Sequence, residues 1–284
     1  MEDTFLSTQA GFFTSGAPVY DPARPPSWSA LGPWEVLYAV MERAKRGDFS
    51  HSRRIFQLLD ETAHMDLWNG AIVLAGFTAP ADELARWVAG LQTTEISQDI
   101  IKYAAQALES ACGLWAVPAL LQLHRDSSYE PTREVVQWRT ATIIEPRGGP
   151  LHEVEVSDGF REIAAARHRE LVERFGSEQT IVRYGRVFDV TDLAHQMLVN
   201  LRDPEQDEVD FGVDRCVFEA YTGVDCRPCF ADRELQRLTA AALLEEFLDN
   251  PPRLEPGVRY FFKHRVPDTI KTAREPASPA PILD

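Results

Sequence analysis

Two of the four cysteines in this 284-residue chain belong to the segment Cys226-Arg227-Pro228-Cys229. A Cys-x-x-Cys spacing can serve thiol–disulfide exchange when a helix N-terminus lowers the pKa of one thiol. It can also supply two of the four ligands of a zinc ion. In a third interpretation the segment is a buried turn, in which the proline stiffens the backbone and the cysteines act as small apolar side chains.

The neighbouring sequence favours the structural turn. No strand–helix–strand pattern precedes the cysteines, and the next helix is predicted to begin only at Ala231 or Asp232, with Asp232 as its N-cap. A zinc site would need a second ligand pair, and the sequence has no other Cys-x-x-Cys. We therefore expect no metal and no cofactor. The zinc alternative would use Cys216, Cys226, Cys229 and His264.

The familiar catalytic motifs are missing from the rest of the chain. None of the seven histidines forms His-Glu-x-x-His, and no serine stands in Gly-x-Ser-x-Gly. Gly148 and Gly149 are not followed by the Lys-Ser or Lys-Thr of a phosphate-binding loop. The sequence therefore predicts a protein that is not an enzyme.

Carboxylates are concentrated in one region. Residues 203–255 contain fourteen acids and five arginines, a net −9 out of −15 for the whole chain. The segment 203–210, DPEQDEVD, predicts an exposed loop, but it lacks the central glycine of a calcium-binding EF-hand. It is either a solvated loop or a surface for Lys and Arg of a partner. The candidate partner-binding residues are Asp203, Glu205, Asp207, Glu208, Asp210, Asp214, Asp225, Asp232 and Glu234.

The overall charge restricts the class of partner. With 29 basic and 44 acidic residues, the chain repels phosphate backbones and anionic lipid surfaces, so we expect neither nucleic acid nor a membrane as partner. The same charge would accelerate association with a basic protein, although acidity can also serve solubility alone. No apolar run approaches a membrane span and no signal peptide is evident, which predicts a cytoplasmic protein with reduced thiols.

Helices are the elements expected to position these residues. Pro33 opens a helix whose apolar face includes Leu37 and Met41, and Gly47 ends it. Alternation around Gly185 predicts a short strand pair or an extended crossing. The segment 256–267 is expected to be extended and to pack its aromatic residues against the last helices. Further helices are predicted over 55–59, 67–77, 84–91, 156–176, 190–201 and 234–249.

Three segments repeat with offsets of 34 and 35 residues: LWNGAIVL (67–74), IKYAAQAL (101–108) and VQWRTATI (136–143). Each is followed by a second apolar helix. Helical hairpins of this kind stack into an α-solenoid, because none can bury its inner face alone. An ordinary helical bundle is the alternative. Small residues inside the repeats, such as Gly70 and Ala104, favour the solenoid since they allow neighbouring helices to approach closely.

The repeats resemble HEAT repeats. The succession of FREIAAARHRELVERFG, YGRVFDVTDLAHQML, YTGVDCRPCF and PGVRYFFKHRVP resembles HEAT-like bacterial immunity proteins of polymorphic-toxin systems, among them the immunity protein 47 family. The resemblance covers roughly residues 33–267 and implies an immunity protein that neutralises a cognate toxin by occluding its working site. It supplies no catalytic residue. A general HEAT scaffold for protein assembly is the alternative, and a thiol or zinc protein using Cys226 and Cys229 is a third.

The expected organisation is mainly α, a HEAT-like α-solenoid of stacked helical hairpins with a short extended insertion. Four parts follow one another: an irregular segment (1–32), helical repeats (33–146), a helical C-terminal part continuous with the solenoid (147–267) and a tail (268–284). The partner implied by the resemblance and the charge is a basic toxin.

Overall fold

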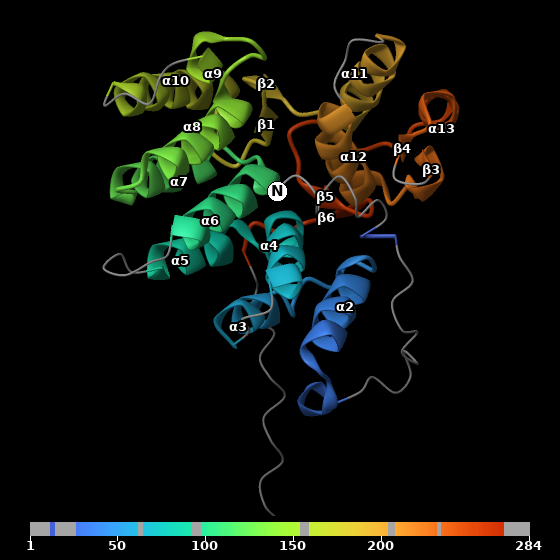
Figure 1. Ribbon diagram of the computed structural model, residues 1–284, viewed down its shortest axis with the longest axis horizontal. Coiled ribbons are helices and arrows are strands. Elements are labelled where there is room, and N and C mark those ends of the chain that lie inside the picture. The colour runs from blue at the N-terminus through green and yellow to red at the C-terminus, as the bar shows by residue number, and fades with distance from the viewer. Residues whose placement is uncertain are drawn as a thin grey trace, which may run out of the picture.

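The computed structural model describes residues 12–14, 27–61, 65–91, 98–153, 159–203, 208–231 and 234–269, and this part of the chain is mainly helical (Figure 1). Its α-helices are α2 (Pro33–Ala44), α3 (Arg53–Glu61), α4 (Met65–Thr78), α5 (Ala81–Gly90), α6 (Gln98–Ala111), α7 (Ala116–Asp126), α8 (Glu130–Ile144), α9 (Pro150–Glu153), α10 (Phe160–Phe175), α11 (Val190–Arg202), α12 (Glu208–Thr222) and α13 (Arg237–Asp249). Two short 3-10 helices are η1 (Trp28–Ala30) and η2 (Arg227–Cys229).

Short antiparallel hairpins connect or follow the helices. They pair β1 (Val182–Arg183) with β2 (Arg186–Val187), β3 (Phe230–Ala231) with β4 (Glu234–Leu235), and β5 (Tyr260–Phe261) with β6 (His264–Arg265). The first hairpin confirms the strand pair predicted around Gly185, whose φ of +69° suits a glycine in a tight turn.

The predicted limits of the first helix are confirmed. Pro33 occupies its first position, and the Gly32 N–H donates a hydrogen bond of 2.8 Å to the Glu35 carboxylate, so one otherwise unpaired donor is satisfied. The helix ends at Ala44, and Gly47 follows with a φ of +83°. A side chain at Gly47 would also come within 3.0 Å of the His264 imidazole.

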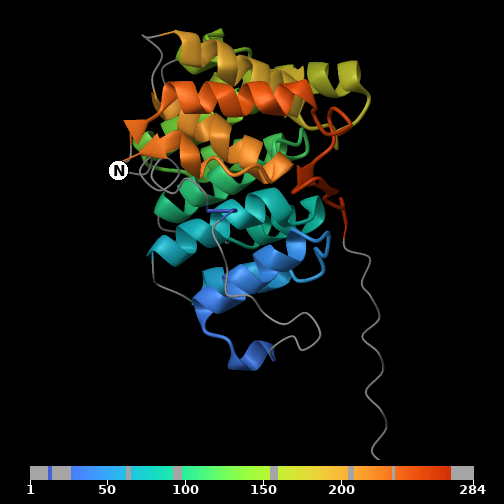
Figure 2. The same cartoon turned by 90° about the vertical axis from the view of Figure 1, so that its right-hand side faces the viewer.

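The repeated segments form the centres of α4, α6 and α8, which pack against one another in chain order. With α2 at its beginning, the row consists of α2, α4, α6 and α8, and α5, α7 and α10 pack along one side of it. The helices therefore lie in successive layers (Figure 2). At Gly70, inside the first repeated segment, an added Cβ would lie 3.1 Å from the Leu37 side chain on α2. The tight contact with α6 is instead at Gly76, just after that segment, where an added Cβ would lie 2.6 Å from the Cβ of Ser110. Close contact between α4 and α6 therefore requires a glycine at this position.

A second group of helices, α11 to α13, lies beside this row. Helix α11 packs against both α12 and α13 (Figure 1). Two predictions fail here. Helix α12 begins at Glu208, within the expected acidic loop, and the helix expected from 234 begins only at Arg237, after the β3–β4 hairpin. The pattern of α12 was difficult to recognise because Asp214, Arg215 and Glu219 occupy buried positions on it.

The β5–β6 hairpin brings the two groups of helices together through aromatic contacts. The Phe261 side chain is fully buried, and its ring meets Phe13 edge-on with 5.4 Å between centroids. Phe13 in turn meets Phe77 of α4 at 5.3 Å. The C-terminal aromatic segment was expected to pack on the last helices alone, so that prediction is incomplete: its most buried ring reaches the N-terminal half.

Backbone and guanidinium hydrogen bonds fix the same hairpin on both sides. The Phe262 N–H donates to the Ala220 carbonyl of α12 at 2.7 Å. Arg259 donates to the carbonyls of Gly76 and Ala79 at the C-terminus of α4, at 3.4 and 2.5 Å. A cation is favourable at a helix C-terminus. Because the hairpin packs on both groups of helices, one contiguous apolar core includes residues from Phe12 to Val266. None of the described helices combines the length and the apolar character needed to cross a membrane.

Candidate protein-binding surface

The Cys-x-x-Cys segment is a turn that includes η2, with both cysteines buried and Arg227 and Pro228 exposed. Cys226 and Cys229 are 1% and 0% exposed, and the Cys229 N–H donates to the Cys226 carbonyl at 3.0 Å. The Glu219 carboxylate accepts the Cys226 N–H at 3.1 Å, which anchors the turn to α12. A hydrogen bond between the thiols raises the pKa of Cys226 and lowers that of Cys229. This geometry agrees with the structural-turn interpretation.

The alternative zinc ligands are not brought together. Among the described residues, which include all four of them, no group of three or more His, Cys, Asp or Glu side chains is placed to hold a metal ion. His264 lies on β6 beside Gly47, near the end of α2. The turn is closed by backbone hydrogen bonds that need no metal.

Alkaline pH is expected to lower the stability of the protein through the other two cysteines. Burial raises the pKa of Cys112 and that of Cys216 to about 12. Unfolded thiols ionise near pH 8.5, so between about pH 9 and 12 the folded state binds more protons than the unfolded state. The free energy of unfolding should therefore fall by about 1.4 kcal/mol per pH unit for each thiol. Urea titrations between pH 8 and 10.5 measure this slope, and Cys216→Ala should flatten it; an unchanged slope would refute the assignment.

Asp214 does not belong to a partner-binding surface, and that prediction is wrong. Its side chain is 2% exposed, and its two oxygens accept hydrogen bonds from Arg147 at 2.8 Å and from Arg183 at 2.9 Å. The two arginines are 67 and 31 residues away in the sequence. A carboxylate with such distant partners cannot be distinguished from a surface acid by local pattern.

Asp225 is placed at the surface, but its charge is already engaged. The Arg227 guanidinium donates to both carboxylate oxygens, at 2.6 Å for the shortest contact, and the Thr14 hydroxyl donates at 3.1 Å. The hydrogen bonds from Arg227 hold the pKa of this carboxyl below its usual value, against the opposing effect of burial. Asp225 is therefore a weak attractor for a partner's cation.

The other predicted acids divide into three sets. Asp203, at the C-cap of α11, and Glu234, on β4, are exposed. Glu208 and Asp210 lie in the first turn of α12, and their side chains are outside the described part of the structure. Three further residues are also outside the described residues: Glu205, Asp207 and Asp232.

An exposed stripe on α13 was not included in the predicted site. It comprises Leu238, Ala242, Glu245, Glu246 and Asp249, and we call it the α13 face. These residues follow helical spacing, while Ala240, Leu244 and Phe247 are buried on the opposite side. Leu238 is 88% exposed. The helical spacing of apolar residues in α13 could be recognised from the sequence, but the exposure of Leu238 could not.

Helix α11 borders the α13 face and holds it in place. The two helices lie side by side across the side of the molecule shown in Figure 2. Arg237, the first residue of α13, donates to the carbonyls of Leu201 and Asp203 at 3.3 and 2.8 Å, and so caps the end of α11. Arg202 of α11 pairs with Glu245 at 3.2 Å. Val199 on α11 is 60% exposed.

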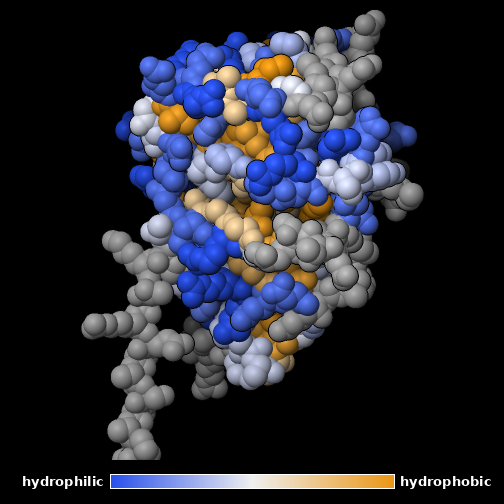
Figure 3. Space-filling model, turned by 90° about the vertical axis from the view of Figure 1, so that its left-hand side faces the viewer, coloured by the Kyte–Doolittle hydropathy of each residue, from blue (hydrophilic) through white to orange (hydrophobic). Residues whose placement is uncertain are grey.

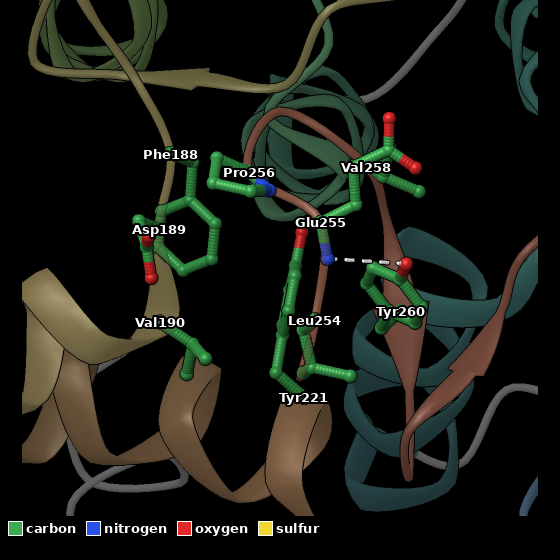
Figure 4. A pocket seen from close by; sticks show the side chains of 9 residues that line it. All are labelled: Phe188, Asp189, Val190, Tyr221, Leu254, Glu255, Pro256, Val258 and Tyr260. Atoms are coloured by element: carbon green, nitrogen blue, oxygen red, sulfur yellow. Dashed lines mark hydrogen bonds between the residues drawn. The ribbon is translucent and has the colours of Figure 1, made fainter. Parts of the chain in front are cut away.

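Neither of two hollows near the C-terminal segment resembles an enclosed substrate site. The first lies between Phe188, Tyr221 and Leu254, where the Glu255 N–H donates to the Tyr260 hydroxyl at 3.3 Å (Figure 4). Its volume of about 10 Å³ has room for roughly one water molecule.

The second hollow is an open cleft of about 240 Å³ between residues 177–181 and 255–268. Arg259 and Arg265 line it together with Glu255 and Asp268, so the side-chain charges in the cleft nearly cancel. The cleft therefore offers no strong electrostatic preference for an anion or a cation.

Comparisons with known proteins supply no relative. No family model, no curated protein and no solved structure matches this chain.

Proposed function

We propose that the protein is an immunity protein that binds a basic toxin domain in the cytoplasm and neutralises it by occluding its working site. The resemblance to HEAT-like immunity proteins suggests the class of function. The observation that carries the proposal in the structure is the exposure of Glu246 and Asp249 on α13 and of Glu234 on β4, without cationic partners among the described residues. Such charges can meet Lys and Arg of another protein.

The arrangement of the other helices supports the finer fold proposal. We propose that α2 to α10 form a HEAT-like stack, because α2, α4, α6 and α8 make one row and α5, α7 and α10 pack along its side. Stacked hairpins of this kind present extended surfaces to partners. The α11–α13 group would then add an acidic docking surface at the side of the stack.

Electrostatics also explains why such a partner would be basic. Complementary charge raises association rates and suppresses wrong partners more than it raises affinity, and salt screens the effect. A chain with a net charge of −15 is therefore expected to associate fastest with a cationic domain and to repel nucleic acid.

A general HEAT scaffold remains the second candidate function, because apolar side chains are exposed elsewhere too. Tyr129, Trp138 and Ile163 are 54%, 43% and 51% exposed. Apolar surface also runs between hydrophilic areas on the side of the molecule shown in Figure 3. A scaffold would hold two partners at once, whereas an immunity protein needs one.

The proposed function predicts tight, salt-sensitive binding to one toxic domain. The probe is the purified domain encoded by the gene next to that of this protein, tested by co-expression for rescue of growth and by stopped-flow mixing for association. Growth should be rescued, and the association rate should fall about tenfold or more between low and high salt. Changing Asp207, Glu208 and Asp210 to Lys should slow association and remove much of the salt dependence. Absence of binding or of rescue would reject the proposed function and favour a scaffold.

A further inference from the structure

Leu238 is the most exposed of the large apolar side chains in the described part of the chain, at 88%. A single exposed leucine needs no special explanation. Leu238, however, shares the α13 face with the exposed Ala242 one turn later and with carboxylates on the next two turns. An apolar residue beside a group of charges is the arrangement found at protein interfaces with an apolar centre and a polar rim.

The helix that carries Leu238 is fixed by contacts of its buried side with α12 and of its first turn with α11. Phe247 of α13 meets Phe218 of α12 edge-on at 4.8 Å, and Leu244 is 1% exposed. Arg237 fixes the first turn of the helix by its hydrogen bonds to the end of α11. The side chain of Leu238 is therefore presented from a preorganised element, which reduces the entropic cost of binding.

The charges around Leu238 define the chemistry of the partner. Glu246 and Asp249 have no cationic partner among the described residues, and Glu245 is shared with the exposed Arg202. A second copy of the same face would place like charges opposite one another, and a nucleic acid would be repelled. A surface that bears Lys and Arg is the complementary occupant.

We propose that Leu238 is the apolar anchor of a docking surface on the α13 face, and that the partner presents an apolar recess rimmed by Lys and Arg side chains. The inference rests on the proposed function, since it assigns the place where a basic toxin domain docks. Buried anchors at the centre of an interface dominate its binding energy, while rim charges govern the association rate.

The test measures binding of the neighbouring gene's purified toxic domain to two matched pairs of variants. Leu238→Ser is compared with Ile163→Ser, because Ile163 on α10 is also an exposed aliphatic residue. Leu238→Ser should weaken binding about 30-fold, mainly through faster dissociation, as expected of an interface hot spot. Ile163→Ser should change the affinity less than about twofold if it lies outside the interface.

The charged rim is tested with two double variants that change the net charge by the same amount. The test variant carries Glu246→Lys and Asp249→Lys on α13. The control variant carries Glu162→Lys and Glu173→Lys on α10, where both acids are exposed. The α13 pair should lower the low-salt association rate about tenfold more than the α10 pair. Circular dichroism confirms that each variant is folded. Binding that is equally affected by both members of each pair overturns the docking surface and leaves the proposed function intact. Failure of the unaltered protein to bind overturns both.

Discussion

Replacing Asp214 by alanine is expected to lower the free energy of unfolding by about 3–5 kcal/mol, the typical cost of removing one partner from a buried ion pair. Asp214 joins helix α12 to Arg147, which follows α8, and to Arg183 on β1. It therefore links the α11–α13 group to the row of stacked helices. Urea unfolding at neutral pH measures the loss.

The reason for so large an effect is the burial of Arg183. Its side chain is 4% exposed. Burial is the largest single effect and lowers the pKa of this guanidinium, but attraction by the Asp214 carboxylate, together with smaller contributions from Tyr184, Cys112 and Glu109, raises the pKa of Arg183 well above its usual value. Without the carboxylate, the folded state would hold a buried charge with no counter-ion, or would have to open to hydrate it.

Asp225→Ala serves as the matched control for Asp214→Ala. Asp225 is also an aspartate paired with arginine, but both side chains of that pair are partly exposed, at 37% and 50%. Exposed pairs contribute little to stability because water solvates and screens the charges. Equal losses in the two variants would mean that the Asp214 network does not hold the two groups of helices together.

Replacing Phe261 by alanine is the second large effect that we expect, again about 3–5 kcal/mol of unfolding free energy. The Phe261 ring is fully buried against Phe13, and Phe13 is fully buried against Phe77 of α4. Truncation would leave a cavity where the C-terminal hairpin meets the N-terminal half. Neighbouring rings could fill it only by moving away from their own contacts.

Phe262→Ala is the control within the same hairpin. Phe262 is only partly buried, with the Lys45 ammonium 5.1 Å from its ring centroid, so its truncation should cost clearly less than that of Phe261. Thermal and urea unfolding of both variants measure the difference. If the Phe261 variant were as stable as the unaltered protein, the β5–β6 hairpin would not stabilise the contact between the two groups of helices.

The sequence by itself determined most of the helices and the strand pair around Gly185. Local periodicity was sufficient for α2 and α11, because side-chain burial in these helices follows the 3.6-residue repeat. In α4, by contrast, every residue from 70 to 78 is buried. The repeated segments lie on α4, α6 and α8, which pack against one another in chain order. The concentration of acids between 203 and 255 was likewise a property of composition, and needed no structure.

Only the tertiary structure decided which charges are available to a partner. Asp214 and Glu245 are both carboxylates on helices, yet the first is buried between two distant arginines and the second is 57% exposed. The same dependence on distant partners explains why α12, with charged residues at buried positions, and the β3–β4 hairpin were missed. Helical periodicity acts between residues three or four apart, whereas the partners that make a charge or an aromatic ring stable inside the fold come from anywhere in the chain.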